Sequence, residues 1–405
     1  MTKHTALHEE HTKLGASFTD FGGWDMPLKY GSELAEHRAV REAAGLFDLS
    51  HMGEVWVSGP DAARFLNTAL AGNLAAIAEG KAKYSFILNE EGGIIDDLIV
   101  YRIAGAGYAE SRYLVVPNAG NAPTVAAALA ERAAGFDVEV IDASADTSLI
   151  AVQGPVAEKI LLKVVREEDR AAVAELRYYA WVAVAVPIEG AADIDAAASG
   201  GATSTASVDG SRGAIDVLLA RTGYTGEDGF ELFIPNDRAA ELWQLLLAEG
   251  AGEGLIPCGL ASRDSLRLEA GMPLYGNELG LDTNPFEAGL GPVVSLKKEE
   301  DFVGRAALEA AKERAVSRLL VGLKGLGRRA GRTGYVVHEA GVDGVPGREI
   351  GRITSGQPSP TLGYPIALAY IEPDLAGTGT VVQVDLRGKL EPFEVVDLPF
   401  YKRQA

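Results

Sequence analysis

Two adjacent carboxylates, Asp96 and Asp97, stand inside the apolar run GGIIDDLIVY, residues 92–101. The run predicts a buried strand, and side chains alternate between the faces of a strand, so the two acids point in opposite directions. Only one of them needs to lie in the interior. An ionised carboxylate in apolar surroundings loses much of its hydration energy unless a cation or a hydrogen-bond donor meets it. The pair therefore indicates a functional acid, or else a strand end whose acids bond nearby backbone.

A third acid stands in RTGYTGEDGFEL, residues 221–232. A glycine turn there precedes a predicted strand, in which Phe230 and Leu232 share one face. Glu231 takes the opposite face, so we expect it to point at something other than that apolar core.

Two arginines, Arg263 and Arg267, stand four residues apart in GLASRDSLRLEAG and share one face of a predicted helix. Asp264 and Glu269 are available as partners, so an intrahelical salt-bridge network is the alternative to a binding role.

Other residues with reactive side chains have weaker patterns. His4, His8 and His11 share a face if TALHEEHTKLG is helical, but the spacing is HEEH rather than HExxH and no further ligands are near. A solvated helix face explains them, and we expect no metal. His51, at a predicted strand start, could act as a base, although a hydrogen-bonded structural role is the alternative. Cys258 precedes a helix, where a thiolate would be favoured, but a small buried residue explains it as well.

The composition narrows the class of protein. The chain has 405 residues, 47% hydrophobic, enough for two or three domains. Its 57 acidic and 37 basic residues give a formal charge of −20, which argues against nucleic-acid binding. This net charge is still compatible with a local basic entrance for an anionic substrate. The single cysteine allows no intramolecular disulfide, which favours a reduced cytoplasm. Without an apolar signal core or a run of about 18 apolar residues, we expect neither secretion nor a membrane span.

The sequence lacks several common cofactor-binding and catalytic motifs. There is no GxxxxGK[ST] phosphate loop and no GxSxG nucleophile elbow. Gly325, Gly327 and Ala330 approximate GxGxxG/A, but RRAGRTGY follows in place of a helix, so no helix amino terminus is available for a pyrophosphate.

The elements that must position the acids form an α+β unit. KYSFILNEEGG and IIDDLIVYRIA predict an antiparallel hairpin joined by the turn at 91–93. Helix patterns flank it, DAARFLNTALAG before and NAPTVAAALAERAAG after, the second capped by Asn118 or Asn121. LFDLSHMGEVWV predicts a turn and then a strand. The strand–helix–strand crossover of a doubly wound nucleotide fold is absent.

The remainder of the chain divides by composition. Residues 189–212 are rich in Ala, Gly, Ser and Thr and predict a mobile insertion. DRAAELWQLLLAEG predicts an amphipathic helix. Gly and Pro are frequent between 278 and 296, where we expect a domain change, and the short strands of 317–396 predict an all-β barrel or sandwich.

Taken in order, these strings resemble the T-protein family of the glycine cleavage system, the folate-dependent aminomethyltransferases. The resemblance runs nearly from end to end. The strings that carry it are HTKLGASFTDFGGWDMPLKYGS, LFDLSHMGE, KYSFILNEEGGIIDDLIVY, IAVQGP, RTGYTGEDGFEL, RDSLRLEAGMPLYGNE, DFVGRAAL and ITSGQPSPTLGYPIALAYI.

This resemblance implies an α+β fold of three domains, a cloverleaf around a central folate channel. Residues 1–47 plus 147–285 would form a discontinuous first domain, 48–146 a second with an antiparallel sheet and helices, and 286–405 a C-terminal β-barrel-like domain. The insertion at 189–212 is longer than the family's usual connection, and we expect a surface loop without a catalytic part.

The resemblance also implies an activity. Such an enzyme transfers the methylene of an aminomethyl-lipoyl carrier to tetrahydrofolate, releasing ammonia and giving 5,10-methylenetetrahydrofolate. Tetrahydrofolate would be the co-substrate and the lipoylated H-protein the partner. We expect no metal, flavin or nicotinamide.

The family's site residues carry over by motif. Asp97 resembles the acid at the reactive nitrogens of the folate, where a carboxylate would stabilise developing positive charge and accept a proton. Glu231 and Arg263 resemble the folate-contacting acid and arginine, and Asn118 occupies the matching asparagine position. The implied pocket walls are Met52, Tyr84, Tyr101 and Tyr224, with an ordinary core role as the alternative, above all for Tyr101.

Two other functions fit a similar sequence. A folate-binding accessory protein of iron–sulfur assembly would carry a KGCYxGQE-type motif, whereas this chain has RDSLRLEAGMPLYGNE without the cysteine. A folate-dependent demethylase acting on a small donor is the second alternative.

Overall fold

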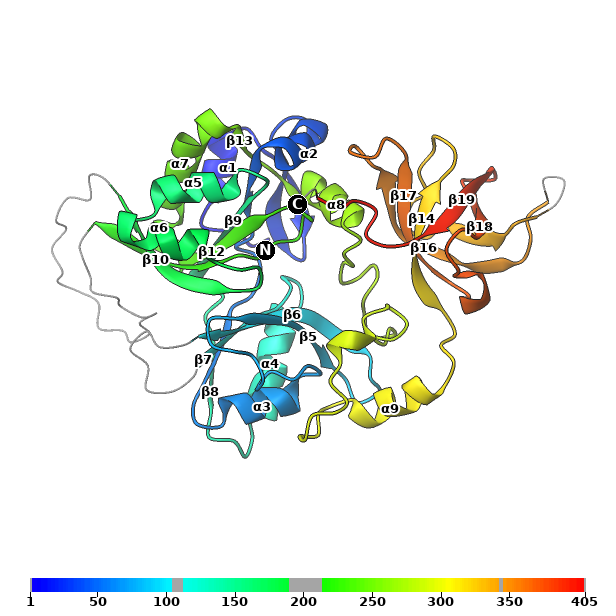
Figure 1. The fold of residues 1–405 in the computed structure, drawn as a ribbon, viewed down its shortest axis with the longest axis horizontal. Helices are drawn as coiled ribbons and strands as arrows, with labels where there is room; N and C mark the ends of the chain where they lie inside the picture. Colours follow the sequence, from blue (N-terminus) through cyan, green and yellow to red (C-terminus); the bar gives the residue numbers. More distant parts are fainter. Residues whose placement is uncertain (1, 104–111, 189–212, 342–344, 404–405) are drawn as a thin grey trace.

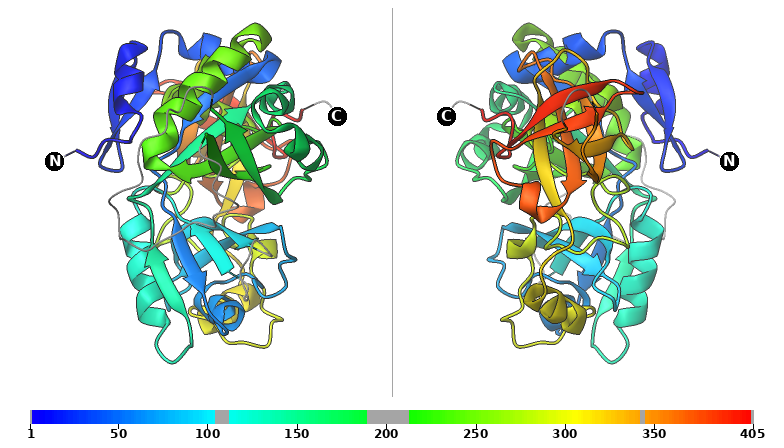
Figure 2. Two further views of the ribbon diagram at one scale, coloured as in Figure 1. Left: turned by 90° about the vertical axis from the view of Figure 1, so that its left-hand side faces the viewer. Right: turned by 90° about the vertical axis from the view of Figure 1, so that its right-hand side faces the viewer.

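The computed structural model describes residues 2–103, 112–188, 213–341 and 345–403, so the predicted insertion at 189–212 lies outside the described residues. Figure 1 shows three lobes around a central region, which the chain crosses after helix α8. The first two lobes each combine a sheet with helices, and the third is a barrel. Figure 2 shows the start and the end of the chain on opposite sides of the molecule.

The first lobe is built on a six-stranded sheet, in which β13 is parallel to β3 and the other pairs are antiparallel. Its strands, in spatial order, are β10 (Trp181–Pro187), β11 (Ala214–Ala220), β12 (Gly229–Pro235), β9 (Thr147–Gln153), β3 (Ala44–Asp48) and β13 (Leu255–Pro257). The helices on one face are α5 (Ala157–Val164), α6 (Arg170–Ala174) and α7 (Ala239–Gly250). Phe230 and Leu232 pack against these helices, which confirms the predicted alternation and leaves Glu231 on the other face. Residues 46–48, the LFD of LFDLSHMGE, are the last three residues of strand β3. The turn predicted at the start of this string was therefore wrong for these residues.

The N-terminal segment adds a small sheet and two helices to this lobe. These elements are α1 (His8–Lys13), β1 (Ser17–Phe21), β2 (Trp24–Lys29) and α2 (Glu33–Glu42). Helix α8 (Leu260–Glu269) contacts both α2 and β2.

The second lobe has a five-stranded antiparallel sheet. Its strands, in spatial order, are β5 (Ala82–Leu88), β6 (Ile94–Ile103), β7 (Arg112–Val116), β4 (Val55–Ser58) and β8 (Glu139–Asp142). Helices α3 (Ala62–Ala69) and α4 (Ala122–Arg132) cover one face through a core that includes Val57, Phe65 and Leu129. The predicted hairpin is confirmed as β5 and β6. Asn121 occupies the N-cap position of α4, one of the two positions predicted, but its side chain makes no cap hydrogen bond.

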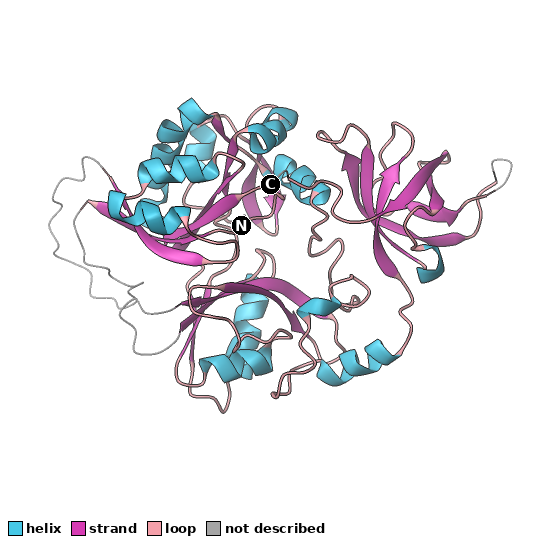
Figure 3. Cartoon of the chain, in the orientation of Figure 1, coloured by secondary structure: helices cyan, strands magenta, loops and turns pink. Residues whose placement is uncertain are grey.

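The third lobe is a closed barrel that follows helix α9 (Arg305–Glu313), and it is built almost entirely of strands (Figure 3). Its strands, in spatial order, are β14 (Leu319–Gly325), β17 (Pro365–Ile371), β16 (Glu349–Pro358), β15 (Val336–Glu339), β18 (Val381–Asp385) and β19 (Leu390–Val396).

Short 3-10 turns occur in several connections of the described chain. They are η1 (Glu167–Asp169), η2 (Asn236–Arg238), η3 (Ala251–Glu253), η4 (Gly291–Val293) and η5 (Pro373–Leu375).

The α+β class and the terminal barrel are thus confirmed, whereas the domain boundaries at 47, 146 and 285 stay a prediction. Within the described ranges, no helix has both the length and the apolar character needed to cross a bilayer.

A buried acid at the end of α8 joins the first lobe to the barrel. The Glu269 carboxylate accepts hydrogen bonds from Arg41 (2.8 Å) on α2 and from Ser359 (2.5 Å) and Thr361 (2.8 Å) beside the barrel, and His37 lies 3.2 Å away. Burial acts to raise the pKa of Glu269, but His37 and the other donors outweigh it and hold that pKa at about 2. The carboxylate is therefore a charged, fully partnered link between lobes.

We expect Glu269→Gln to lower the free energy of unfolding by about 3–5 kcal/mol, because it leaves the buried donors without their anion. The folded-state pKa lies below the ordinary value of 4.5, so the stabilisation is complete above that pH and is lost as pH falls through about 2. Urea unfolding at several pH values measures both effects. Glu249→Gln, at an exposed position of α7, is the control and should change stability by less than about 0.5 kcal/mol. Equal stability of the two variants at neutral pH would contradict this role.

Candidate active site

A cavity of about 650 Å³ lies between the two sheets, helix α8 and the connection that follows it. This volume is within the range of small-molecule sites in proteins. All eight residues predicted to form the site line the cavity: Met52, Tyr84, Asp97, Tyr101, Asn118, Tyr224, Glu231 and Arg263. The structure therefore brings together side chains that are up to 211 positions apart in the sequence, from Met52 to Arg263.

The two adjacent acids have different surroundings, although the Asn118 amide nitrogen donates to both carboxyls. The Asp97 carboxyl faces the cavity and accepts hydrogen bonds from the Tyr84 hydroxyl and the Asn118 amide, both at 2.9 Å. Asp96 is fully buried and accepts from the Asn118 backbone N–H at 2.8 Å and from the Asn121 amide at 2.7 Å. The expectation that only one of the two acids needs to lie in the interior agrees with this burial, since Asp96 is fully buried and Asp97 is only partly buried.

Burial shifts the titration of both acids. It raises the pKa of Asp97 to about 6, although the Tyr84 and Asn118 donors oppose the rise. It raises the pKa of Asp96 as well, and the neighbouring Asp97 charge adds to that shift. A carboxyl with a pKa close to neutral pH can both stabilise positive charge and exchange a proton.

Asn118 lines the cavity, but most of its side chain is committed to the acids. Its amide nitrogen donates to Asp96 Oδ1, to the Asp97 carbonyl and to Asp97 Oδ1, each at 2.9 Å. Only the amide oxygen is left for a ligand, because the amide nitrogen has no third proton to donate. Asn118 therefore orients the Asp97 carboxyl in addition to whatever contact it makes with a substrate.

Glu231 is 8% exposed and reaches the cavity from β12. One carboxyl oxygen, Oε2, accepts from the Thr222 hydroxyl at 2.5 Å and from the Tyr101 hydroxyl at 3.5 Å. Burial raises the pKa of Glu231, and Thr222 and Arg263 act against that rise. Tyr101 also packs edge-on against Phe233, so it serves the core and the cavity at once.

The two arginines of α8 have different surroundings. Arg267 is 1% exposed and paired, with Asp264 at 2.8 Å and with Glu278 at 3.0 Å, so the salt-bridge alternative holds for it. Glu269 is not part of an intrahelical network, because it pairs with α2 and the barrel instead. Arg263 lies over the Tyr224 ring at 4.9 Å, and its buried Nη1 has no hydrogen-bond partner among the described residues. An unpartnered guanidinium nitrogen in a cavity wall calls for an acceptor from a ligand.

Sequence reasoning missed several aromatic residues of the wall. Tyr179 lines the cavity with a left-handed backbone, φ +56°, a conformation that is uncommon for a residue other than glycine. Nothing in the string ELRYYAW signals that conformation. Tyr275 also lines the cavity, and its place in RDSLRLEAGMPLYGNE, one of the family strings, was a signal that could have found it.

The two candidate reactive side chains, His51 and Cys258, are both buried. His51 lines the cavity, and burial lowers its pKa to about 4, which makes it a neutral and weak base. The hydrogen-bonded structural role considered for His51 is not seen at Nδ1, which has no partner among the described residues. Cys258 is a small residue of the core, as its alternative predicted, and burial raises the pKa of its thiol.

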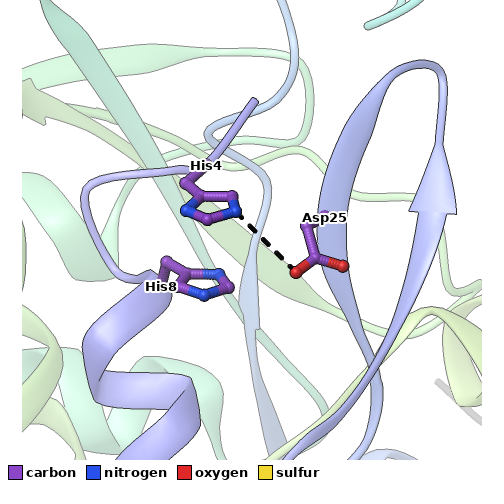
Figure 4. A group of neighbouring side chains, drawn as sticks. All are labelled: His4, His8 and Asp25. Atoms are coloured by element: carbon purple, nitrogen blue, oxygen red, sulfur yellow. Dashed lines mark ion pairs between the residues drawn. The ribbon is translucent and has the colours of Figure 1, made fainter. Parts of the chain in front are cut away.

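The three N-terminal histidines do not share a helix face, because α1 begins only at His8. His11 is buried and bonds Asp48 at 2.8 Å. His4 and His8 instead stack with ring centroids 3.8 Å apart beside Asp25, which lies 3.9 Å from His4 (Figure 4). An ion bonds imidazole in the ring plane, and one ion cannot lie in both planes of a parallel stack, so we assign no metal to this group.

The fold and the cavity define a three-lobed protein with a central cavity of small-molecule size, which a carboxyl and a guanidinium nitrogen without a partner among the described residues both face. Comparison with known proteins specifies the family. Residues 7–192 and 188–298 match the GCVT N-terminal domain, and residues 318–402 match the glycine cleavage T-protein C-terminal barrel domain. The chain therefore belongs to the glycine cleavage T-protein family.

Individual relatives cover the whole chain. It is 53% identical to an aminomethyltransferase of Streptomyces coelicolor, over 99% of this chain and 98% of that one, and 52% identical to an aminomethyltransferase of Cutibacterium acnes, over 99% of each. The crystal structure of glycine cleavage system aminomethyltransferase T from Bartonella henselae superposes with a TM-score of 0.83 at 36% identity, over 99% of both chains.

The Tyr84 hydrogen bond makes a testable contribution to the acid. We expect Tyr84→Phe to raise the pKa of Asp97 by about one unit, because it removes a donor that favours the ionised carboxylate. Carbon-detected NMR titration of the aspartate carboxyls measures this shift. Tyr224→Phe is the matched control, since the Tyr224 hydroxyl donates to the Pro273 carbonyl and not to Asp97. A pKa of Asp97 that stays the same, or falls, in Tyr84→Phe would rule out this contribution.

Proposed function

We propose that this chain is the aminomethyltransferase of the glycine cleavage system, with tetrahydrofolate as acceptor and the lipoylated H-protein as donor. The observation that carries the proposal is the Asp97 carboxyl, held by two donors in the wall of a cavity of about 650 Å³. Membership of the T-protein family over nearly the whole chain supports the same assignment. We also propose a cytoplasmic location, in keeping with a chain whose one cysteine is a buried thiol.

The polar groups of the cavity suit a reduced folate. A pterin presents an amide and an amino group side by side as a pair of donors. The two carboxyl oxygens of Glu231 offer acceptors for that pair. The unpartnered Nη1 of Arg263 offers a cationic donor, which we assign to a carboxylate of the folate tail. Met52, Tyr84, Tyr101 and Tyr224 would enclose the rings.

Asp97 stands where the transferred carbon becomes positive. The donor carries an aminomethyl group on sulfur, and departure of ammonia leaves a methylene cation stabilised by that sulfur. One folate nitrogen then bonds to the carbon and loses its proton to Asp97. The second nitrogen closes the ring as the carbon–sulfur bond breaks, and the proton that this nitrogen loses converts the leaving thiolate to the carrier thiol. A fixed carboxylate beside such a centre contributes about two to four orders of magnitude in rate.

The two alternative functions have less support. The accessory-protein function needs a cysteine motif that the chain lacks. A demethylase would act on a small free donor, whereas the relatives compared above are named aminomethyltransferases. Ammonia release from aminomethylated carrier, measured beside demethylation of a small donor, separates the two enzymes.

Asp97→Asn tests the proposed chemistry. The amide keeps the shape of the side chain but loses its charge, so we expect affinity for tetrahydrofolate within about tenfold of the native value and activity lower by at least about a hundredfold. Asp20→Asn is the control, because Asp20 also lines the cavity but is exposed. Isothermal titration and ammonia release measure the two quantities. Unchanged turnover in Asp97→Asn would mean that the acid is structural.

A further inference from the structure

A second cavity, of about 370 Å³, lies between the same two sheets. Phe233 belongs to its wall, and the Tyr101 ring, 5.6 Å from Phe233 in edge-on contact, belongs to the wall of the first cavity. The two aromatic rings therefore stand between the cavities. Apolar side chains make up much of the second wall, among them Trp56, Trp181 and Leu218.

One buried acid in this wall, Glu54, has a carboxyl group without hydrogen-bond donors among the described residues. It immediately precedes β4, where Trp56 also faces the cavity while Val55 and Val57 face the helical core, so alternation directs Glu54 into the cavity. Glu54 has no exposed surface, and neither carboxyl oxygen has a hydrogen-bond partner among the described residues.

The backbone around Glu54 fixes this arrangement. Its N–H donates to the Ser144 hydroxyl at 2.9 Å, and its carbonyl accepts from the Ala143 N–H at 2.9 Å. Asp142, whose charge acts on Glu54, accepts from the N–H and the hydroxyl of Ser144 and so has its own donors. Native proteins rarely leave a buried carboxyl without a donor, so the missing partner at Glu54 indicates a ligand.

The charges around the cavity indicate the sign of that ligand. Five acids line it, against two arginines: Glu54, Asp142, Asp146, Asp169 and Asp216, against Arg112 and Arg166. Both arginines already have partners, since Arg112 lies over the Trp56 ring at 3.9 Å and Arg166 lies 4.0 Å from Glu168. An anion would meet a surplus of carboxylates, whereas a cation would be attracted.

We propose that this second cavity binds a small organic amine with an apolar or aromatic body, whose ammonium group pairs with Glu54. The body would lie among Trp56, Trp181 and Phe233, and the ammonium would supply the donors that Glu54 lacks. Burial, together with the charge of Asp142, raises the pKa of Glu54 well above its ordinary range, and a cation beside the carboxyl would lower that pKa again. Binding of an ammonium then releases the Glu54 proton to solvent.

The test uses 2-phenylethylamine as the probe and 2-phenylethanol as its uncharged counterpart, with the full-length protein and no folate present. Isothermal titration in buffers of different ionisation enthalpy measures affinity and proton release together. We expect the amine to bind with release of a proton. Binding should become tighter as pH rises, because a smaller fraction of Glu54 then carries the proton that the ammonium displaces. Glu54→Gln should weaken amine binding at least tenfold, abolish the proton release and leave binding of the alcohol unchanged.

Two further variants keep the proposal open to refutation. Asp146→Asn removes an exposed acid of the same wall and should change amine affinity less than about threefold. Ala183→Phe enlarges an exposed residue of the wall and should abolish binding of both probes by filling the space. Amine binding that survives Glu54→Gln and Ala183→Phe, or no binding to the native protein, would overturn the proposal. Neither outcome bears on the aminomethyl transfer, which is measured separately.

Discussion

A carboxylate inside an apolar wall needs donors, and the structure around Asp97 is arranged to supply them. Asn118 donates to both acids of β6, and Tyr84 adds a donor from the neighbouring strand. Asn121, at the position before α4, donates to Asp96 and does not cap the helix. A lost cap costs a helix about 1 kcal/mol, so the hydrogen bonding of the acids has taken precedence over local helix stability.

The buried charges of this protein divide into two kinds. Glu269 and Arg267 are fully partnered, and apart from Asp264 on α8 itself their partners lie on other elements, so they hold α8 against α2, the connection and the barrel. Arg263 and Glu54 have buried polar atoms without a hydrogen-bond partner in the described part of the chain, and each of these residues faces a cavity. Satisfied charges account for the architecture, and the unsatisfied ones mark where a ligand would complete the structure.

Local patterns in the sequence predicted the faces of the elements, whereas partners distant in the chain could not be predicted. Strand alternation was enough to turn Glu231 away from the core, and the Gly–Gly turn was enough to predict the hairpin of β5 and β6. The positions of Asn118 and Met52 came from the family resemblance, because no period or spacing marks them. Glu269 pairs with Arg41, 228 positions away, and a helical pattern offers only partners three or four residues apart. The left-handed backbone of Tyr179 depends in the same way on distant contacts.

The central claim is that the Asp97 carboxyl lies beside the nitrogens of the folate that receive the one-carbon unit. A crystal structure of the protein with tetrahydrofolate tests this most directly. The account predicts that the carboxyl lies about 3 Å from at least one of those nitrogens, with the pterin ring against Glu231. A well-ordered folate whose reactive nitrogens lie beyond contact distance of Asp97 would contradict it.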